Sequence, residues 1–162
     1  MRQLIDGYRL FPGQLNVTFA AGIMGRILAI DYGQKRVGLA VTDELQLIAN
    51  GLETVAAKDI WNYLSGYLKR EPVDVIVVGE PRDMRNRPSD ASRFVEPFVR
   101  KLRKTYPDMK IERFDERFTS KMAFQAMIDG GLGKKKRRNK ALVDTISATL
   151  ILQSYLESVK HY

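Results

Sequence analysis

Residues 26–41, with the sequence RILAIDYGQKRVGLAV, decide how this chain folds. An apolar run at 27–30 continues into Asp31, and a second apolar run at 37–41 follows a short basic turn. This pattern predicts two neighbouring strands, with a carboxylate emerging where the first strand leaves the core. Burying a carboxylate is costly unless it is paired or binds a metal. Asp31 is therefore either a residue at the mouth of a functional cleft or a turn-forming residue, because Asp and Gly are common in turns.

The composition indicates one globular domain. The 162 residues are 44% hydrophobic and 28% charged, and no apolar run approaches the roughly 20 residues that span a bilayer. We therefore expect a cytoplasmic protein without membrane contact. There is no cysteine, and the one histidine, His161, lies beside the C-terminus. This argues against thiolate and histidine metal sites and against a Ser-His-Asp site, so a catalytic metal would need oxygen ligands.

Residues 1–23 differ from the rest of the chain. They hold three charged residues and a Pro-Gly break at 12–13, and the mildly apolar run at 15–23 lacks the leading basic region of an export signal. We expect an N-terminal appendage or an over-long start, with the domain proper at 24–160.

The remaining pattern predicts an α/β fold. After the first two strands we expect a strand within 45–55, a helix at 58–70, a strand at 73–79, a helix at 89–105, a strand at 110–118, a helix from Thr119 or Ser120 to Asp129, and a last helix at 140–158. Three consecutive strands can pair antiparallel, and strands reached through a helix are added in parallel. A mixed sheet of about five strands with helices on both faces follows.

The last helix carries an acid in its apolar stripe. Spacings of 3, 4, 3 and 4 residues place five side chains on one face: Ala141, Asp144, Ala148, Ile151 and Tyr155. A charged residue in such a stripe needs a partner. Asp144 is therefore either part of a functional site, or an acid favoured by the helix dipole or paired with a lysine.

Other acids are expected at strand ends, namely Asp31, Glu80 and Glu116. The carboxyl ends of parallel strands line the ligand crevice of α/β sheets, and Asp144 would face them. Clustered carboxylates without histidine or cysteine suit Mg²⁺ or Mn²⁺. Two such ions can activate a water and stabilise the leaving oxygen of a phosphodiester, so metal-assisted phosphodiester hydrolysis is the leading reaction.

Four motifs, DYGQKRVGLAV, VIVVGEP, DERFTS and ALVDTISATLILQSYL, resemble those of the YqgF/RuvX family, and the likeness runs from about Met24 to Leu156. The resemblance implies an RNase H-like fold and a pre-16S rRNA nuclease or Holliday junction resolvase. It also implies that Asp31, Asp115, Glu116 and Asp144 are the catalytic acids, with metal held by Asp31, Glu116 and Asp144.

Two points remain open at this level. Family members usually have an apolar residue where Glu80 stands, so Glu80 is either an extra ligand or the partner of Arg82, the second being favoured. Neighbouring strand residues face opposite sides, so only one of Asp115 and Glu116 is expected to face the metal.

A basic segment precedes the last helix, and the chain as a whole has a net charge of +8, which favours nucleic acid as a partner. The segment is either a solvated loop or a phosphate clamp that adds affinity without sequence choice. The expected nucleic-acid-binding residues are Lys35, Arg36, Lys134, Lys135, Lys136, Arg137, Arg138 and Lys140.

The sequence thus favours a metal-dependent endonuclease that acts on structured RNA, in 5′-end maturation of precursor 16S rRNA, or on branched DNA as a Holliday junction resolvase. A non-catalytic ribosome-assembly module with vestigial acids is the alternative class. A sugar-kinase-like ATPase ranks last, because the chain is too short for a second lobe. The protein is expected to be a monomer or a homodimer, and symmetric junction cleavage would favour the dimer.

Overall fold

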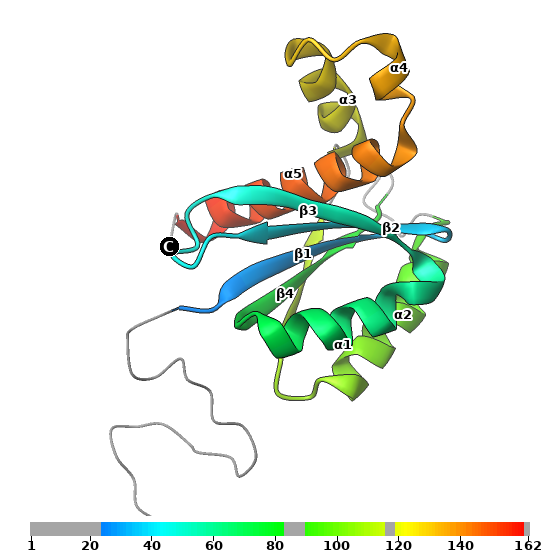
Figure 1. Ribbon diagram of the computed structural model, residues 1–162. Helices are drawn as coiled ribbons and strands as arrows, with labels where there is room; N and C mark the ends of the chain where they lie inside the picture. Colours follow the sequence, from blue (N-terminus) through cyan, green and yellow to red (C-terminus); the bar gives the residue numbers. More distant parts are fainter. Residues whose placement is uncertain (1–23, 83–89, 116–118, 161–162) are drawn as a thin grey trace, which may run out of the picture.

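The computed structural model describes residues 24–82, 90–115 and 119–160 (Figure 1). The expected appendage, 1–23, lies outside the described residues. In chain order the elements are β1 (Arg26–Tyr32), β2 (Arg36–Thr42), β3 (Ala49–Ala56), the 3-10 turn η2 (Ala57–Asp59), α1 (Ile60–Arg70), β4 (Val73–Glu80), α2 (Ser92–Thr105), β5 (Lys110–Asp115), α3 (Thr119–Asp129), α4 (Lys134–Arg137) and α5 (Lys140–Lys160).

The described strands form one five-stranded sheet in the order β3-β2-β1-β4-β5. Pairing is antiparallel from β3 through β2 to β1, and parallel from β1 through β4 to β5. The predicted mixed sheet is therefore confirmed. The parallel half arises because β4 and β5 are each reached through a helix, whereas the first three strands follow one another directly.

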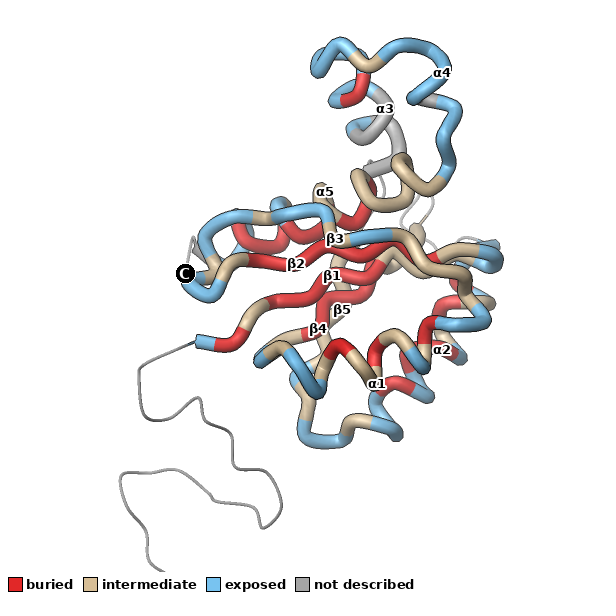
Figure 2. Tube along the Cα trace, in the orientation of Figure 1, coloured by how far each residue is buried: buried red, intermediate tan, exposed pale blue. Residues whose placement is uncertain are grey.

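Helices cover both faces of this sheet (Figure 1). On one face, Leu28 and Ile30 pack with buried side chains of α1 and α2. On the other, Ile27 and Ala29 pack with the buried side of α5. Figure 2 shows both buried layers flanking the central strands. Successive residues of β1 thus serve opposite cores, which is the alternation that a central strand requires.

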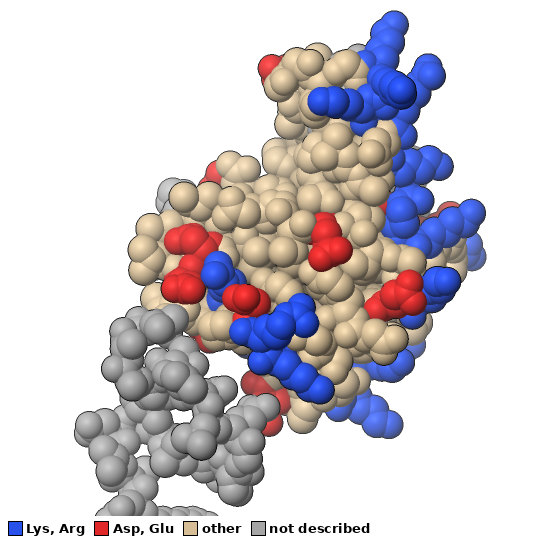
Figure 3. Space-filling model, in the orientation of Figure 1, with Lys and Arg blue, Asp and Glu red and all other residues tan. Residues whose placement is uncertain are grey.

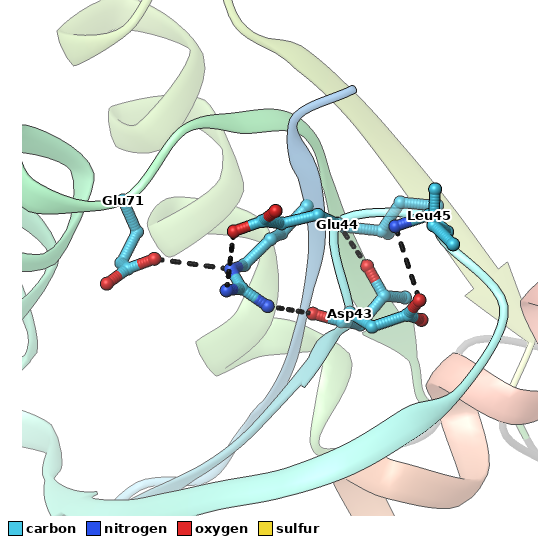
Figure 4. A network of polar contacts seen from close by, with 7 residues as sticks. Asp43, Glu44, Leu45 and Glu71 are labelled. Atoms are coloured by element: carbon cyan, nitrogen blue, oxygen red, sulfur yellow. Dashed lines mark hydrogen bonds and ion pairs between the residues drawn. The ribbon is translucent and has the colours of Figure 1, made fainter. Parts of the chain in front are cut away.

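At the amino end of β1, Arg26 contacts the end of β2, the turn after β2 and the residue after α1 (Figure 4). Arg26 Nη1 donates to the Thr42 carbonyl at 2.9 Å, its Nε contacts Glu71 at 3.2 Å and its Nη2 contacts Glu44 at 3.4 Å. Asp43 accepts backbone N–H bonds from residues 45, 47 and 48. These bonds fix the turn between β2 and β3 against the start of β1.

The helices α3 and α4 stand away from the sheet, beyond the beginning of α5 (Figure 1). The short helix α4 lies in the basic segment, for which the sequence did not predict a helix. Lys and Arg have good helix propensity, so a single turn forms there despite the charge. Within the described residues, none of the helices combines the length and apolar character that crossing a membrane requires.

The amino-terminal part of α5 rests directly on the backbone of β2. A Cβ atom on Gly38 would overlap the carbonyl group of Asp144, so only glycine permits this approach. Thr54 of β3 adds two bonds from the next strand, to the Ala141 carbonyl at 2.7 Å and to the Thr145 hydroxyl at 2.8 Å. The position of α5 over the sheet is therefore fixed by close backbone contact.

We expect Gly38→Ala to destabilise the protein by about 1–3 kcal/mol, because the added methyl group must push α5 away from β2. Urea unfolding measures this loss. Gly66→Ala is the matched control: its Cβ would lie 3.2 Å from a flexible Arg70 side-chain nitrogen, and alanine is the better helix former in α1. Equal stability of Gly38→Ala and the wild type would contradict the proposed packing.

Candidate active site

Asp31 lies near the carboxyl end of β1 on the face that α5 covers. It has the same strand parity as Ile27 and Ala29, whose side chains belong to the α5-facing core. Its side chain is half-buried. The register partner of Asp31 on β2 is Gly38, the residue on which the Asp144 backbone rests. The fold therefore brings Asp31 and Asp144 together from positions far apart in the sequence.

The start of α5 is defined by a side-chain cap. Asn139 Oδ1 accepts hydrogen bonds from the backbone N–H groups of Ala141 at 3.1 Å and Leu142 at 3.3 Å. The cap fixes where the helix begins. Along the helix, Ala148 and Ile151 are buried, and Asp144, one turn earlier on the same face, is half-buried. The predicted inward-facing stripe is confirmed.

The two carboxylates influence each other. Burial, and secondarily the negative charge of Asp144, raise the pKa of Asp31 from 3.8 to about 7. Within the described part of the chain, no ion pair to Asp31 offsets these two effects. A perturbed acid at the carboxyl end of a sheet is also a mark of functional sites.

Arg36, the first residue of β2, partners Asp144. Its Nε lies 2.7 Å from Asp144 Oδ2, and the two side chains are 36% and 25% exposed. The sequence had predicted Arg36 only as a phosphate contact. The pairing could have been suspected from the position of Arg36, two residues before Gly38. Residues two apart on a strand point to the same face, so Arg36 and Gly38 both lie on the face that α5 covers.

Glu80 and Asp115 occupy a different part of the sheet end. They are register partners at the ends of β4 and β5, and strand alternation places them on the face of Ile76 and Ile111, which belongs to the α1–α2 core. Glu80 accepts from Arg82 Nη2 at 3.0 and 3.1 Å, which agrees with the pairing that the sequence favoured. Glu116 lies outside the described residues.

The chemistry of Asp31 and Asp144 fits a hard divalent cation, because both side chains offer carboxylate oxygens and the ionised form of Asp31 is disfavoured by burial. Among the residues that the structure describes, no group of three His, Cys, Asp or Glu side chains is arranged to hold a metal. The described site therefore supplies a pair of acids.

The basic segment presents its charge to solvent. Lys134, Lys135, Lys136, Arg138 and Lys140 are exposed, as is Lys35 at the turn before β2; the Arg137 side chain is not among those described. Figure 3 shows basic side chains on the protruding part of the molecule and along the same edge below it. Tyr32, which follows Asp31, instead stacks on Phe98 with ring centroids 4.2 Å apart, on the α2 side.

The sheet order and helix placement define a protein with an RNase H-like fold. A solved structure, "T. thermophilus RuvC in complex with Holliday junction substrate", shares this fold with a TM-score of 0.50 and 18% identity, covering 83% of this chain and 96% of that one.

Residues 25–158 match the profile of the RuvX family, described as Holliday junction resolvase. The chain belongs to this family. It is 59% identical to a protein of Phocaeicola vulgatus and 58% identical to one of Flavobacterium psychrophilum, covering 99% and 97% of those proteins and 85% and 82% of this chain. Both relatives carry the name "Putative pre-16S rRNA nuclease".

The pKa of Asp31 leads to a prediction for the metal-free protein. With a pKa of about 7 when folded and 3.8 when unfolded, Asp31 keeps a proton in the folded state that the unfolded chain has lost. The free energy of unfolding should therefore fall as the pH rises from about 4 to about 7, relative to an Asp31→Asn variant, and then level off. Urea unfolding of both proteins in EDTA measures the difference, and a difference that is independent of pH would contradict it.

Proposed function

We propose that this protein is a divalent-metal-dependent endonuclease that hydrolyses phosphodiester bonds in structured RNA, and that its substrate is the 5′ end of precursor 16S rRNA. The observation that carries the proposal is the convergence of Asp31 and Asp144 on one face of an RNase H-like sheet. The names of relatives more than half identical to this chain support the RNA substrate. Such a substrate would place the protein in the cytoplasm.

Residues 24–160 are proposed as the nuclease domain, which agrees with a family match at 25–158. A four-way DNA junction is the second candidate substrate, because the family description names a Holliday junction resolvase. Cutting a junction at two symmetric positions would require a homodimer, whereas trimming an RNA end requires one site.

In this proposal Asp31 and Asp144 hold Mg²⁺ or Mn²⁺ through their carboxylate oxygens, with Glu116 as a third ligand. A bound ion would supply an activated water and charge stabilisation at the phosphate. Asp115 and Glu80 lie at the neighbouring strand ends, where they would influence the site through charge.

The exposed cations before α5 serve to bind the nucleic-acid backbone. The segment runs directly into the helix that carries Asp144, so a nucleic-acid backbone bound along it would extend toward the carboxylates. Phosphate contacts give affinity without sequence choice, which suits an enzyme that selects its target by shape. Lys35 and Arg36 extend this basic surface to the turn beside Asp31.

We expect Asp31→Asn to lower cleavage by roughly a thousandfold, because several kcal/mol of transition-state stabilisation depend on the bound metal. Binding of nucleic acid should be almost unchanged. The measurement is cleavage of precursor 16S rRNA and of a synthetic four-way junction in Mg²⁺ or Mn²⁺, with binding followed in parallel.

Asp108→Asn, at an exposed position in the turn before β5, is the matched control and should retain activity. Full activity of the Asp31→Asn protein on both substrates would disprove the assignment of the site. Salt-sensitive binding by the wild type without metal-dependent turnover would instead favour a non-catalytic assembly module.

Replacing Lys134, Lys135 and Lys136 with Gln should weaken RNA binding. It should also make the negative slope of log K against log salt shallower by about 2, since each phosphate contact contributes about 0.7–0.9 to its magnitude. Fluorescence anisotropy at several salt concentrations measures the slope. The control replaces three exposed cations of α2, Arg100, Arg103 and Lys104, and should leave the slope unchanged. An unchanged slope in the first variant would show that the segment is only a solvated surface.

A further inference from the structure

The ion pair between Arg36 and Asp144 is held by backbone on both sides. Gly33 N–H donates to the Arg36 carbonyl at 2.9 Å, which closes the turn before β2, and Ala57 N–H donates to the Lys35 carbonyl at 3.0 Å. On the other side, the Asp144 backbone rests on Gly38. These contacts restrain the backbone of both residues, so rotation of the side chains is the easier way for the pair to open.

The contact itself is suited to exchange. It joins Nε to Oδ2, and no second hydrogen bond between these two side chains is present in the described part of the chain. A two-bond arginine fork, the stronger arrangement, is therefore not formed. With 36% of its side chain exposed, Arg36 can also turn into solvent without crossing the core.

Among the residues that the structure describes, the ion pair printed for these two carboxylates is that of Arg36 with Asp144. From β1 comes Asp31, from α5 comes Asp144, and from β2 comes Arg36. Thr54 of β3 is already bonded to α5, and β4 contributes Gly79, which has no side chain. The guanidinium thus neutralises about half of the negative charge that a divalent ion would neutralise fully.

We propose that Arg36 is a positioning residue that serves as a stand-in cation, holding the Asp144 carboxylate beside Asp31 in the metal-free protein and releasing it when a divalent ion binds. The inference rests on the proposed metal-dependent function. It adds that the Arg36 guanidinium competes with the divalent ion for the Asp144 carboxylate. Once released, the partly exposed Arg36 side chain would turn toward solvent.

The test is calorimetric titration of Mn²⁺ into the metal-free protein without nucleic acid. Arg36→Gln should bind Mn²⁺ about tenfold more tightly than the wild type, because one competing charge at a distance of a few ångströms is removed. Arg36→Lys keeps the charge and should stay within about threefold of the wild type. Lys58→Gln, an exposed cation beside the same turn, controls for the loss of net charge and should not change the affinity.

Urea unfolding in EDTA accompanies the titration. Arg36→Gln should be less stable than the wild type without metal and should regain that stability when Mn²⁺ is added. A purely structural role predicts weaker Mn²⁺ binding instead. An equal or weaker affinity in Arg36→Gln would therefore overturn this inference but not the proposed function.

If neither the wild type nor the variant binds Mn²⁺, the proposed metal-dependent function is disproved together with the inference. If Arg36→Gln does not fold, an Arg36→Lys protein that binds Mn²⁺ several-fold more weakly or more tightly than the wild type also overturns it.

Discussion

The backbone contact between α5 and Gly38 is the constraint on which the site depends. Because Gly38 has no side chain, the helix approaches β2 until the Asp144 carbonyl group occupies the space of a Cβ atom. Gly38 pairs in register with Asp31, so the same contact that positions the helix also sets the depth at which the two acids meet. A larger residue at this position would push α5 away from β2 and would thereby also move Asp144 away from Asp31.

The electrostatics of the site follow from this geometry. Burial of the Asp31 carboxylate, and secondarily the negative charge of Asp144, raise the pKa of Asp31 to about 7. Arg36 stabilises the charge of Asp144 through a single contact, and among the described residues no cation pairs with Asp31 in the same way. Pairs of acids with perturbed pKa values cluster at functional sites. In metal-dependent hydrolysis of phosphodiesters, the negative charge of such a pair would hold the divalent ion. The exposed cations before α5 would bring the phosphate to this place.

Much of the fold was predictable because the chain has strong local signals. The two apolar runs around Asp31, the β-branched run of β4 and the 3–4 spacing of α5 each gave the right element, and the order of elements gave the mixed sheet. The short helix α4 was not predicted, since four basic residues have no apolar period. The sequence could not predict that Asp31 and Glu80 point to opposite faces of the sheet. Which strand residues share a face is known only once the register between β1 and β4 is known. Glu116, expected as a ligand, lies outside the described residues.

The sequence by itself limited the chemical class of the site: without cysteine, and with one histidine at residue 161, a catalytic metal would need oxygen ligands. It also determined that Asp31 leaves a strand and that Asp144 lies in an apolar helical stripe. Only the tertiary structure decided that these acids share a face and that Arg36 contacts one of them. The reason is that these contacts join residues more than 100 positions apart, and their distances depend on strand register and on one close helix approach, which local patterns do not encode.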